Sequence, residues 1–86
     1  HRDLHSFPTR RSSDLLSIFE DHTIQTHDYE RAAEYFNECR NHGIQGTHID
    51  YLICSVATNN DMSIFTLDKD FQHYQKHTKI KLEKYT

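Results

Sequence analysis

The chain contains only two glycines, one proline and two cysteines among its 86 residues. With so few glycines it has no phosphate-binding loop, and no glycine-framed nucleophile at Ser55. Cys39 and Cys54 form no CxxC pair and no disulfide framework, so we expect buried free thiols in a reducing, cytoplasmic setting. No apolar run reaches the length of a membrane span or resembles a signal peptide, and no repeat is present.

The first fifteen residues differ from the rest. HRDLHSFPTRRSSDL has no hydrophobic periodicity and contains the only proline, Pro8. Within it, SFPTRRSSDL (residues 6–15) resembles the translation of a common short-read sequencing adapter, so we exclude it from fold reasoning. A disordered basic leader is the alternative. We therefore interpret residues 1–15 as a non-native or disordered leader and residues 16–86 as part of one small domain, whose natural upstream sequence is expected to be missing.

Charge is unevenly distributed along the remaining residues. Residues 16–68 carry nine acidic side chains against two arginines, a net charge of −7, whereas residues 69–86 carry five lysines against two acids, a net charge of +3. The acidic part would repel nucleic acid unless cations intervene, while the lysines could contact a phosphate backbone. A solvated surface is the plainer explanation of those lysines. They are Lys69, Lys76, Lys79, Lys81 and Lys84.

Hydrophobic periodicity and turn residues predict an alternating order of elements. In chain order we expect a strand at Thr23–Thr26, a helix from Asp28 to Gly43, a helix after Thr47, a turn at 58–61, a strand at Ser63–Thr66, a short helix at about 71–76 and an edge strand within 79–85. Asp28 and Thr47 are the expected N-caps, and Gly43 the expected left-handed helix end. The alternation favours an α/β fold with a mostly parallel sheet.

Three aspartates and one threonine form a candidate metal site. Asp68 and Asp70 follow the expected strand, at the edge where parallel sheets bind ligands. Asp50 begins a helix, and packing of that helix on the strand would bring it to them, with the hydroxyl of Thr66 nearby. Carboxylates are the hard ligands that Mg²⁺ and Mn²⁺ prefer. A metal held there could activate water and neutralise charge on a phosphodiester under in-line attack.

Each aspartate also has a plainer interpretation. Asp50 can be the capping-box partner of Thr47, Asp68 can end a turn, and Asp70 can cap the helix that begins near Phe71. Because acids are common at helix starts, the local pattern alone favours these capping roles.

Histidines and aromatic side chains suggest two further sites. His73 and His77 have i,i+4 spacing, but zinc needs three or four ligands, and the sequence has neither HExxH nor a suitably spaced third partner. We therefore expect exposed histidines. Most of the aromatic residues that could stack on bases lie on predicted apolar faces, so we expect core packing instead. They are Phe36, Tyr51, Phe65, Phe71 and Tyr74.

The order of these features resembles the C-terminal half of a PIN domain, in particular that of VapC-type toxins. In GIQGTHIDYLICSVATNNDMSIFTLDKDFQHY, an aspartate opens an apolar helix (IDYLICSVA), and a turn and short strand lead to a T-x-D-x-D-F signature (TLDKDF). DYERAAEYFNECRNHG is similar to the family's connecting helix, and KIKLEKY to its closing strand. The resemblance covers about residues 20–85 and implies a fragment of a PIN-like three-layer sandwich.

The resemblance implies a divalent-metal ribonuclease that hydrolyses RNA phosphodiester bonds. Asp50 matches the family's third acid, and Asp68 matches the fourth because it follows Thr66 by two. Asp70 is the second choice or an accessory ligand, and Thr66 matches the hydroxyl that supports the Mg²⁺ or Mn²⁺ or its water. Many members are toxins neutralised by a cognate antitoxin, and VapC-like proteins are often homodimers.

The chain departs from the family at the first two acids. An initial strand ending in aspartate and a later helix glutamate have no counterpart, since Glu20 lies beyond the glutamate's position and Asp3 and Asp14 lie in the leader. Two or three carboxylates bind a divalent cation more weakly than four. The alternative is a non-catalytic PIN-like module that binds a protein partner or RNA and is inactive as written.

Overall fold

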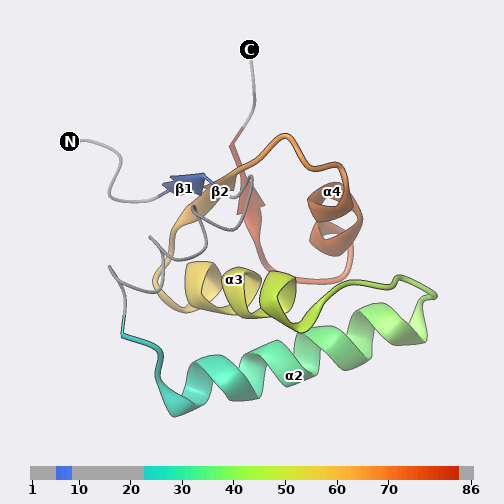
Figure 1. The fold of residues 1–86 in the computed structure, drawn as a ribbon, viewed down its shortest axis with the longest axis horizontal. Coiled ribbons are helices and arrows are strands. Elements are labelled where there is room, and N and C mark those ends of the chain that lie inside the picture. The colour runs from blue at the N-terminus through green and yellow to red at the C-terminus, as the bar shows by residue number, and fades with distance from the viewer. Residues whose placement is uncertain (1–5, 9–22, 84–86) are drawn as a thin grey trace.

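The computed structural model describes the backbone of residues 6–8 and all of residues 23–83, which form a mixed α/β arrangement (Figure 1). Its elements are β1 (Ser6–Pro8), α2 (Thr26–Asn41), α3 (His48–Asn59), β2 (Ser63–Phe65), α4 (Asp70–Gln75) and β3 (Lys81–Leu82). The two longer helices lie side by side, and α3 separates α2 from the strands. The mixed α/β class predicted from the alternation of elements is therefore confirmed.

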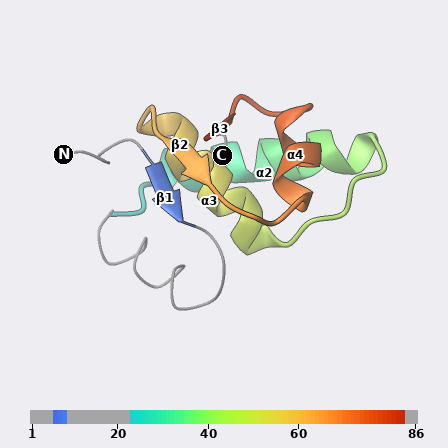
Figure 2. The same ribbon diagram turned by 90° about the horizontal axis from the view of Figure 1, so that it is seen from above.

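The sheet has three parallel strands in the order β1-β2-β3, with β2 in the centre (Figure 2). Ser6 pairs with Ser63 on one side of β2, and Ser63 pairs with Lys81 on the other. The parallel direction follows from α4, which carries the chain back between β2 and β3. β1 comes from the excluded leader. Whether the gene encodes that segment is decided by its DNA sequence, so the adapter interpretation stays a prediction.

The start of α2 differs from the prediction. Thr23–Gln25 form no strand, and the helix begins at Thr26 with Gln25 as its N-cap. Asp28 is therefore not the N-cap. It is the third helical residue, and its Oδ2 accepts the Gln25 N–H at 2.8 Å. The carboxylate reaches backward to complete a capping box, which places the N-cap three residues before the acid.

The link between α2 and α3 follows the prediction. Gly43 has φ +76°, the left-handed conformation in which glycine has no Cβ penalty. Thr47 is the N-cap of α3, and its Oγ1 accepts the Asp50 N–H at 3.1 Å. These two ends fix where α3 begins, and so place Asp50 in its first turn.

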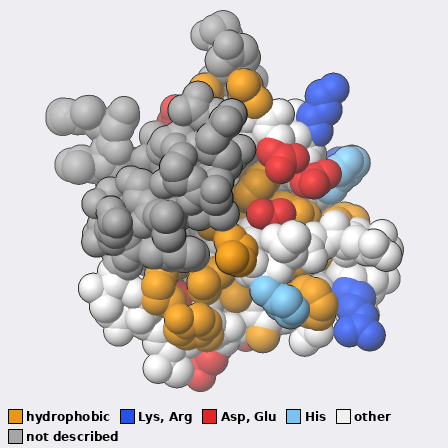
Figure 3. Space-filling view, in the orientation of Figure 1, with side chains coloured by type: hydrophobic (Ala, Val, Ile, Leu, Met, Phe, Trp, Pro, Cys, Tyr) orange, Lys and Arg blue, Asp and Glu red, His pale blue; other side chains and the backbone are white. Residues whose placement is uncertain are grey.

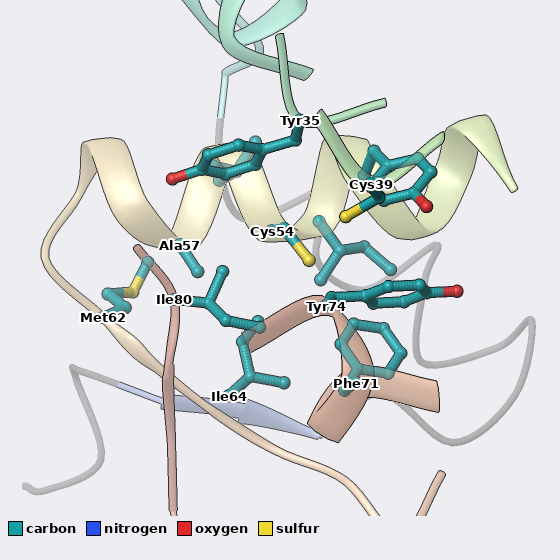
Figure 4. Packing of buried hydrophobic residues seen from close by; sticks show 12 residues of the cluster. Tyr35, Cys39, Cys54, Ala57, Met62, Ile64, Phe71, Tyr74 and Ile80 are labelled. Carbon is teal, nitrogen blue, oxygen red and sulfur yellow. The ribbon is translucent and has the colours of Figure 1, made fainter. Parts of the chain in front are cut away.

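The core lies between the helices and β2, and Figure 4 shows its side chains interdigitating there. Cys39 and Cys54 are buried and unpaired, as predicted. Burial raises the pKa of both thiols, which keeps them protonated and unreactive. The buried apolar residues are Tyr35, Cys39, Tyr51, Ile53, Cys54, Val56, Ala57, Met62, Ile64, Phe71, Tyr74 and Ile80.

Aromatic rings make up much of this core. Tyr74 packs on Tyr51 and on Phe71, with ring centroids 5.0 Å apart in each pair. All three rings are at least 98% buried, so they cannot stack on bases, and their predicted core role is confirmed. Phe36 is partly buried against the same cluster, and Phe65 is half-buried.

Gly46 allows the two tyrosine hydroxyls to approach the backbone. A Cβ on Gly46 would lie 2.6 Å from the Tyr74 hydroxyl and 2.7 Å from that of Tyr51. We expect Gly46→Ala to lower the free energy of unfolding by about 1–3 kcal/mol through overpacking. Gly43→Ala is the contrasting variant, because a Cβ there meets no atom within 4 Å and the cost of about 1–2 kcal/mol is purely conformational.

Urea unfolding and the near-ultraviolet tyrosine signal would separate these two effects. Gly46→Ala should change the environment of the tyrosine rings, whereas Gly43→Ala should leave it as it is. An unchanged tyrosine spectrum and unchanged stability in Gly46→Ala would contradict the close packing at Gly46.

Candidate functional site

Three aspartates from separate elements carry mutually repelling charges at one end of α3. Asp50 is half-buried in the first turn of α3, while Asp68 and Asp70 are exposed after β2 and at the start of α4. They lie close enough that the charges of Asp68 and Asp70 both raise the pKa of Asp50. Figure 3 shows acidic side chains gathered on the face beside α4. The predicted approach of the α3 start to the segment after β2 is present.

The segment after β2 is held by short-range hydrogen bonds. The half-buried Thr66 accepts the Asp68 N–H at Oγ1 (3.0 Å), and Asp68 accepts the Asp70 N–H at Oδ1 (2.9 Å). Asp68, not Asp70, therefore supplies the oxygen that satisfies a free N–H at the start of α4. The predicted helix cap at Asp70 is wrong, because α4 already includes Asp70 as its first residue. Thr66 supports Asp68 directly from the end of the strand.

Asp50 is held by a tyrosine from α4. Tyr74 donates its hydroxyl to Asp50 Oδ2 at 2.8 Å. Burial raises the pKa of Asp50, the Tyr74 hydrogen bond lowers it, and the charge of Asp68 raises it again; Thr47 and Asp70 add smaller effects in opposite directions. Burial and the neighbouring Asp50 also raise the pKa of Tyr74, so its hydroxyl stays protonated and donates.

The three aspartates supply suitable oxygens for Mg²⁺ or Mn²⁺, but their side chains do not already converge on one point. Among the described residues, the group of three ligand side chains whose atoms all lie within 4.8 Å of one another is Glu38, His42 and His77. Asp68 and Asp70 are exposed, so an ion can reach their carboxylates from solvent. The donor set therefore fits a hard divalent cation in its chemistry.

The Tyr74–Asp50 hydrogen bond predicts a pH-dependent loss of stability. Tyr74→Phe should cost about 1.5 kcal/mol at neutral pH, since hydrogen bonds to charged groups contribute roughly 1.5–3 kcal/mol. The raised pKa of Asp50 means that its contribution to stability falls as pH rises from its unfolded pKa through its folded pKa. Removing the Tyr74 hydrogen bond raises the folded-state pKa of Asp50 further, so the fall in Asp50's contribution should extend to higher pH. The stability lost in Tyr74→Phe should be smaller in acid than at neutral pH.

Tyr51 offers a matched control for that experiment. Its hydroxyl is buried, and the Cys39 thiol, a weak hydrogen-bonding group, is its partner among the described residues. Tyr51→Phe removes the same atom but loses no bond to a charged group, so we expect little change in stability or a gain. Urea unfolding in EDTA at acid and neutral pH would compare the pair. Equal losses in the two variants would contradict the assigned role of Tyr74.

The predicted phosphate-binding lysines are not all available. Lys81 Nζ lies 2.5 Å from Asp61 Oδ1, so this lysine already has a carboxylate partner. Lys69, Lys76 and Lys79 are exposed, and Lys69 lies between the two exposed aspartates in sequence. Lys84 lies outside the described residues. So do Glu20, Asp3 and Asp14, the acids considered as counterparts of the family's first two.

A buried polar network joins α2 to α3, and the sequence analysis missed it. Asp28 is 1% exposed, and its Oδ1 accepts from Asn59 Nδ2 at 2.6 Å. Ser55 donates to the Asp28 carbonyl at 2.6 Å, and Arg31 Nε donates to Asn59 Oδ1 at 2.6 Å. No local pattern could show this, because Asp28 and Asn59 are 31 positions apart.

An apolar groove of about 290 Å³ runs between α2 and α3. Tyr29 and Ile49 on its walls are 58% and 44% exposed. The groove lies along the two helices, and its lining residues His48 and Ile49 directly precede Asp50 in α3. Its lining residues are Tyr29, Ala32, Ala33, Phe36, Asn37, His48, Ile49 and Leu52.

Comparison with protein-family models gives no match, and no match is found among the curated proteins. The resemblance to the PIN family therefore stays a prediction. No helix within the described part of the chain is both long and apolar enough to cross a membrane.

Proposed function

We propose that the chain is the C-terminal part of a PIN-like, divalent-metal-dependent ribonuclease, with a three-layer sandwich in the complete protein. The observation that carries this proposal is geometric: Asp50 in the first turn of α3 is hydrogen-bonded to Tyr74 of α4, and it lies close enough to Asp68 and Asp70 for their charges to raise its pKa. Repelling carboxylates gathered after a parallel strand are the arrangement in which a hard cation lowers the energy of the site. Asp50 thus shares one electrostatic environment with Asp68 and Asp70, which lie 18 and 20 positions later in the sequence.

In this proposal Asp50, Asp68 and Asp70 would hold Mg²⁺ or Mn²⁺. The chemistry supplied there would be activation of a water and neutralisation of charge on the RNA phosphate. Tyr74 orients the Asp50 carboxylate through its 2.8 Å hydrogen bond, and Thr66 holds the backbone of Asp68. Lys69 would help to hold the phosphate backbone.

The test is RNA cleavage by the complete protein, obtained by sequencing the gene upstream of the codon for Leu16. We expect an in-frame hydrophobic strand ending in aspartate and a later helix with glutamate, and cleavage that requires Mg²⁺ or Mn²⁺ and stops in EDTA. Cleavage that persists in EDTA would contradict the metal-dependent mechanism. A genome that encodes SFPTRRSSDL at this place would favour a non-catalytic domain instead.

The groove between α2 and α3 favours a second role, binding of a protein partner. Exposed apolar side chains rimmed by polar groups are typical of interaction sites. In the toxin interpretation this partner is a cognate antitoxin, with a homodimer as the other occupant. The corresponding non-catalytic module would bind its protein or RNA partner equally well with and without metal, which a binding measurement with and without EDTA would test.

A further inference from the structure

Two histidines and a glutamate come together at the end of the molecule where α2 stops. Glu38 lies in the last turns of α2, His42 is the C-cap of that helix, and His77 lies just after α4. One ligand atom of each lies within 4.8 Å of the others. Two imidazoles and one carboxylate are a recognised three-ligand set for zinc, with a water in the fourth position.

The orientation of His42 suits metal binding. Its Nδ1 lies 3.0 Å from the carbonyl oxygen of Glu38 and 3.6 Å from the carboxylate Oε2 of the same residue. Metal-binding histidines commonly donate one ring N–H to a backbone carbonyl, which leaves the opposite nitrogen able to bind. In His42 that nitrogen is Nε2, so the Glu38 carboxylate, which lies on the Nδ1 side, has to turn toward Nε2 to share an ion with it. The His42 and His77 rings stack with centroids 4.0 Å apart, which brings His77 to the same place from another element. Because imidazole binds a metal in the plane of its ring, one of the two stacked rings has to turn for both to bind one ion.

The electrostatic setting favours a cation. The carbonyl groups at the C-terminus of a helix carry partial negative charge, and α2 has 16 residues whose dipoles add up. The nearest basic side chain of α2, Arg40, lies over the ring of Phe36 at 5.9 Å. The Glu38 and His42 side chains are 52% and 48% exposed, so an ion can reach them from solvent.

We propose that Glu38, His42 and His77 form a zinc site that links the end of α2 to the turn after α4. This site is separate from the aspartates and goes beyond the proposed nuclease activity. Ligand atoms of one tetrahedral zinc lie roughly 3.3 Å apart, given bonds of about 2.0–2.2 Å. Rotation of the exposed side chains closes the remaining gap. The bound ion ties together residues that are 35 positions apart, and so stabilises the folded chain.

The experiment is a Zn²⁺ titration of the metal-stripped chain, without an affinity tag, read by competition with a chromophoric chelator and by thermal unfolding. We expect Zn²⁺ to raise the unfolding temperature, and to do so also in saturating Mg²⁺, because Mg²⁺ prefers the oxygen ligands of the aspartates. His77→Gln and His42→Gln should each weaken Zn²⁺ binding by at least about tenfold, because changes outside the ligand set alone weaken metal sites about 10- to 100-fold.

Two control histidines separate this site from nonspecific binding. His73 and His48 are exposed and outside the group, so His73→Gln and His48→Gln should bind Zn²⁺ as the parent chain does. Glu38→Gln changes only an exposed helical side chain, so it should stay folded. It therefore still tests the site if a histidine variant unfolds. The proposal is overturned if the parent chain shows no Zn²⁺-dependent shift, or if Glu38→Gln, His42→Gln and His77→Gln all retain parental affinity.

Discussion

Replacing Asp28 by alanine is expected to lower the free energy of unfolding by about 3 kcal/mol or more. The buried carboxylate accepts hydrogen bonds from Asn59 and from the Gln25 backbone, and both donors would lose their partner. Hydrogen bonds to charged groups contribute roughly 1.5–3 kcal/mol each, and unpaired buried groups add a desolvation cost. Because small domains have only about 5–15 kcal/mol in total, this variant should lose a large share of its stability.

Urea unfolding of Asp28→Ala beside Glu30→Ala would test this. Glu30 is exposed in the same turn of α2, so its removal should change stability by no more than about 0.5 kcal/mol. Asn59→Ala should reproduce part of the Asp28 loss, and the double variant should lose less than the sum, because both changes delete the same bond. Additive losses, or equal losses at positions 28 and 30, would contradict the network.

The second large effect is expected on activity, and not on stability. Within the proposed function, Asp50→Asn should reduce metal-dependent RNA cleavage by the complete protein at least about hundredfold, since metal-ion catalysis contributes several kcal/mol to the transition state. The asparagine oxygen can still accept the Tyr74 hydroxyl. Because the pKa of Asp50 is raised, its ionised form opposes folding, and the neutral variant should be as stable as the parent, or more so, at neutral pH.

Asp61→Asn is the matched control for that measurement. Asp61 is an exposed acid in the turn before β2, and it pairs with Lys81 instead of joining the aspartates of the site. Its cleavage rate and Mn²⁺ dependence should be those of the parent. If Asp50→Asn loses stability and activity together, or if Asp61→Asn is as inactive as Asp50→Asn, the carboxylate at position 50 has no special role.

Local signals were sufficient to predict most of the fold. Gly43 and Thr47 mark the end of α2 and the start of α3 through backbone conformation and side-chain capping, which depend on neighbouring residues only. The strand expected at Thr23–Thr26 was wrong, although threonine and isoleucine there are good strand formers. The backward hydrogen bond from Gln25 to Asp28 favours the helix, and a strand would also need a partner strand that the local sequence cannot supply.

The candidate site was predictable in part. The position of Asp50 relative to the segment after β2 follows from packing of α3 on the sheet, and this was inferred from element order. The contribution of Tyr74 was missed, because a buried hydroxyl aimed at a carboxylate 24 positions away looks in sequence like any apolar aromatic. His42 was missed for the same reason: its partner His77 lies on another element, and only tertiary packing brings the two rings together.

The central position of β2 has a consequence for the order of folding. Pairing with β3 joins Ser63 to Lys81, 18 positions along the chain, whereas pairing with β1 joins it to Ser6, 57 positions away. The entropy of closing the longer loop is less favourable by about 1 kcal/mol. The β2–α4–β3 unit is therefore expected to form first. The edge of β2 that pairs with β1 stays unpaired until β1 binds to it. During that interval the edge can recruit a strand from another chain, so the last step of folding competes with aggregation.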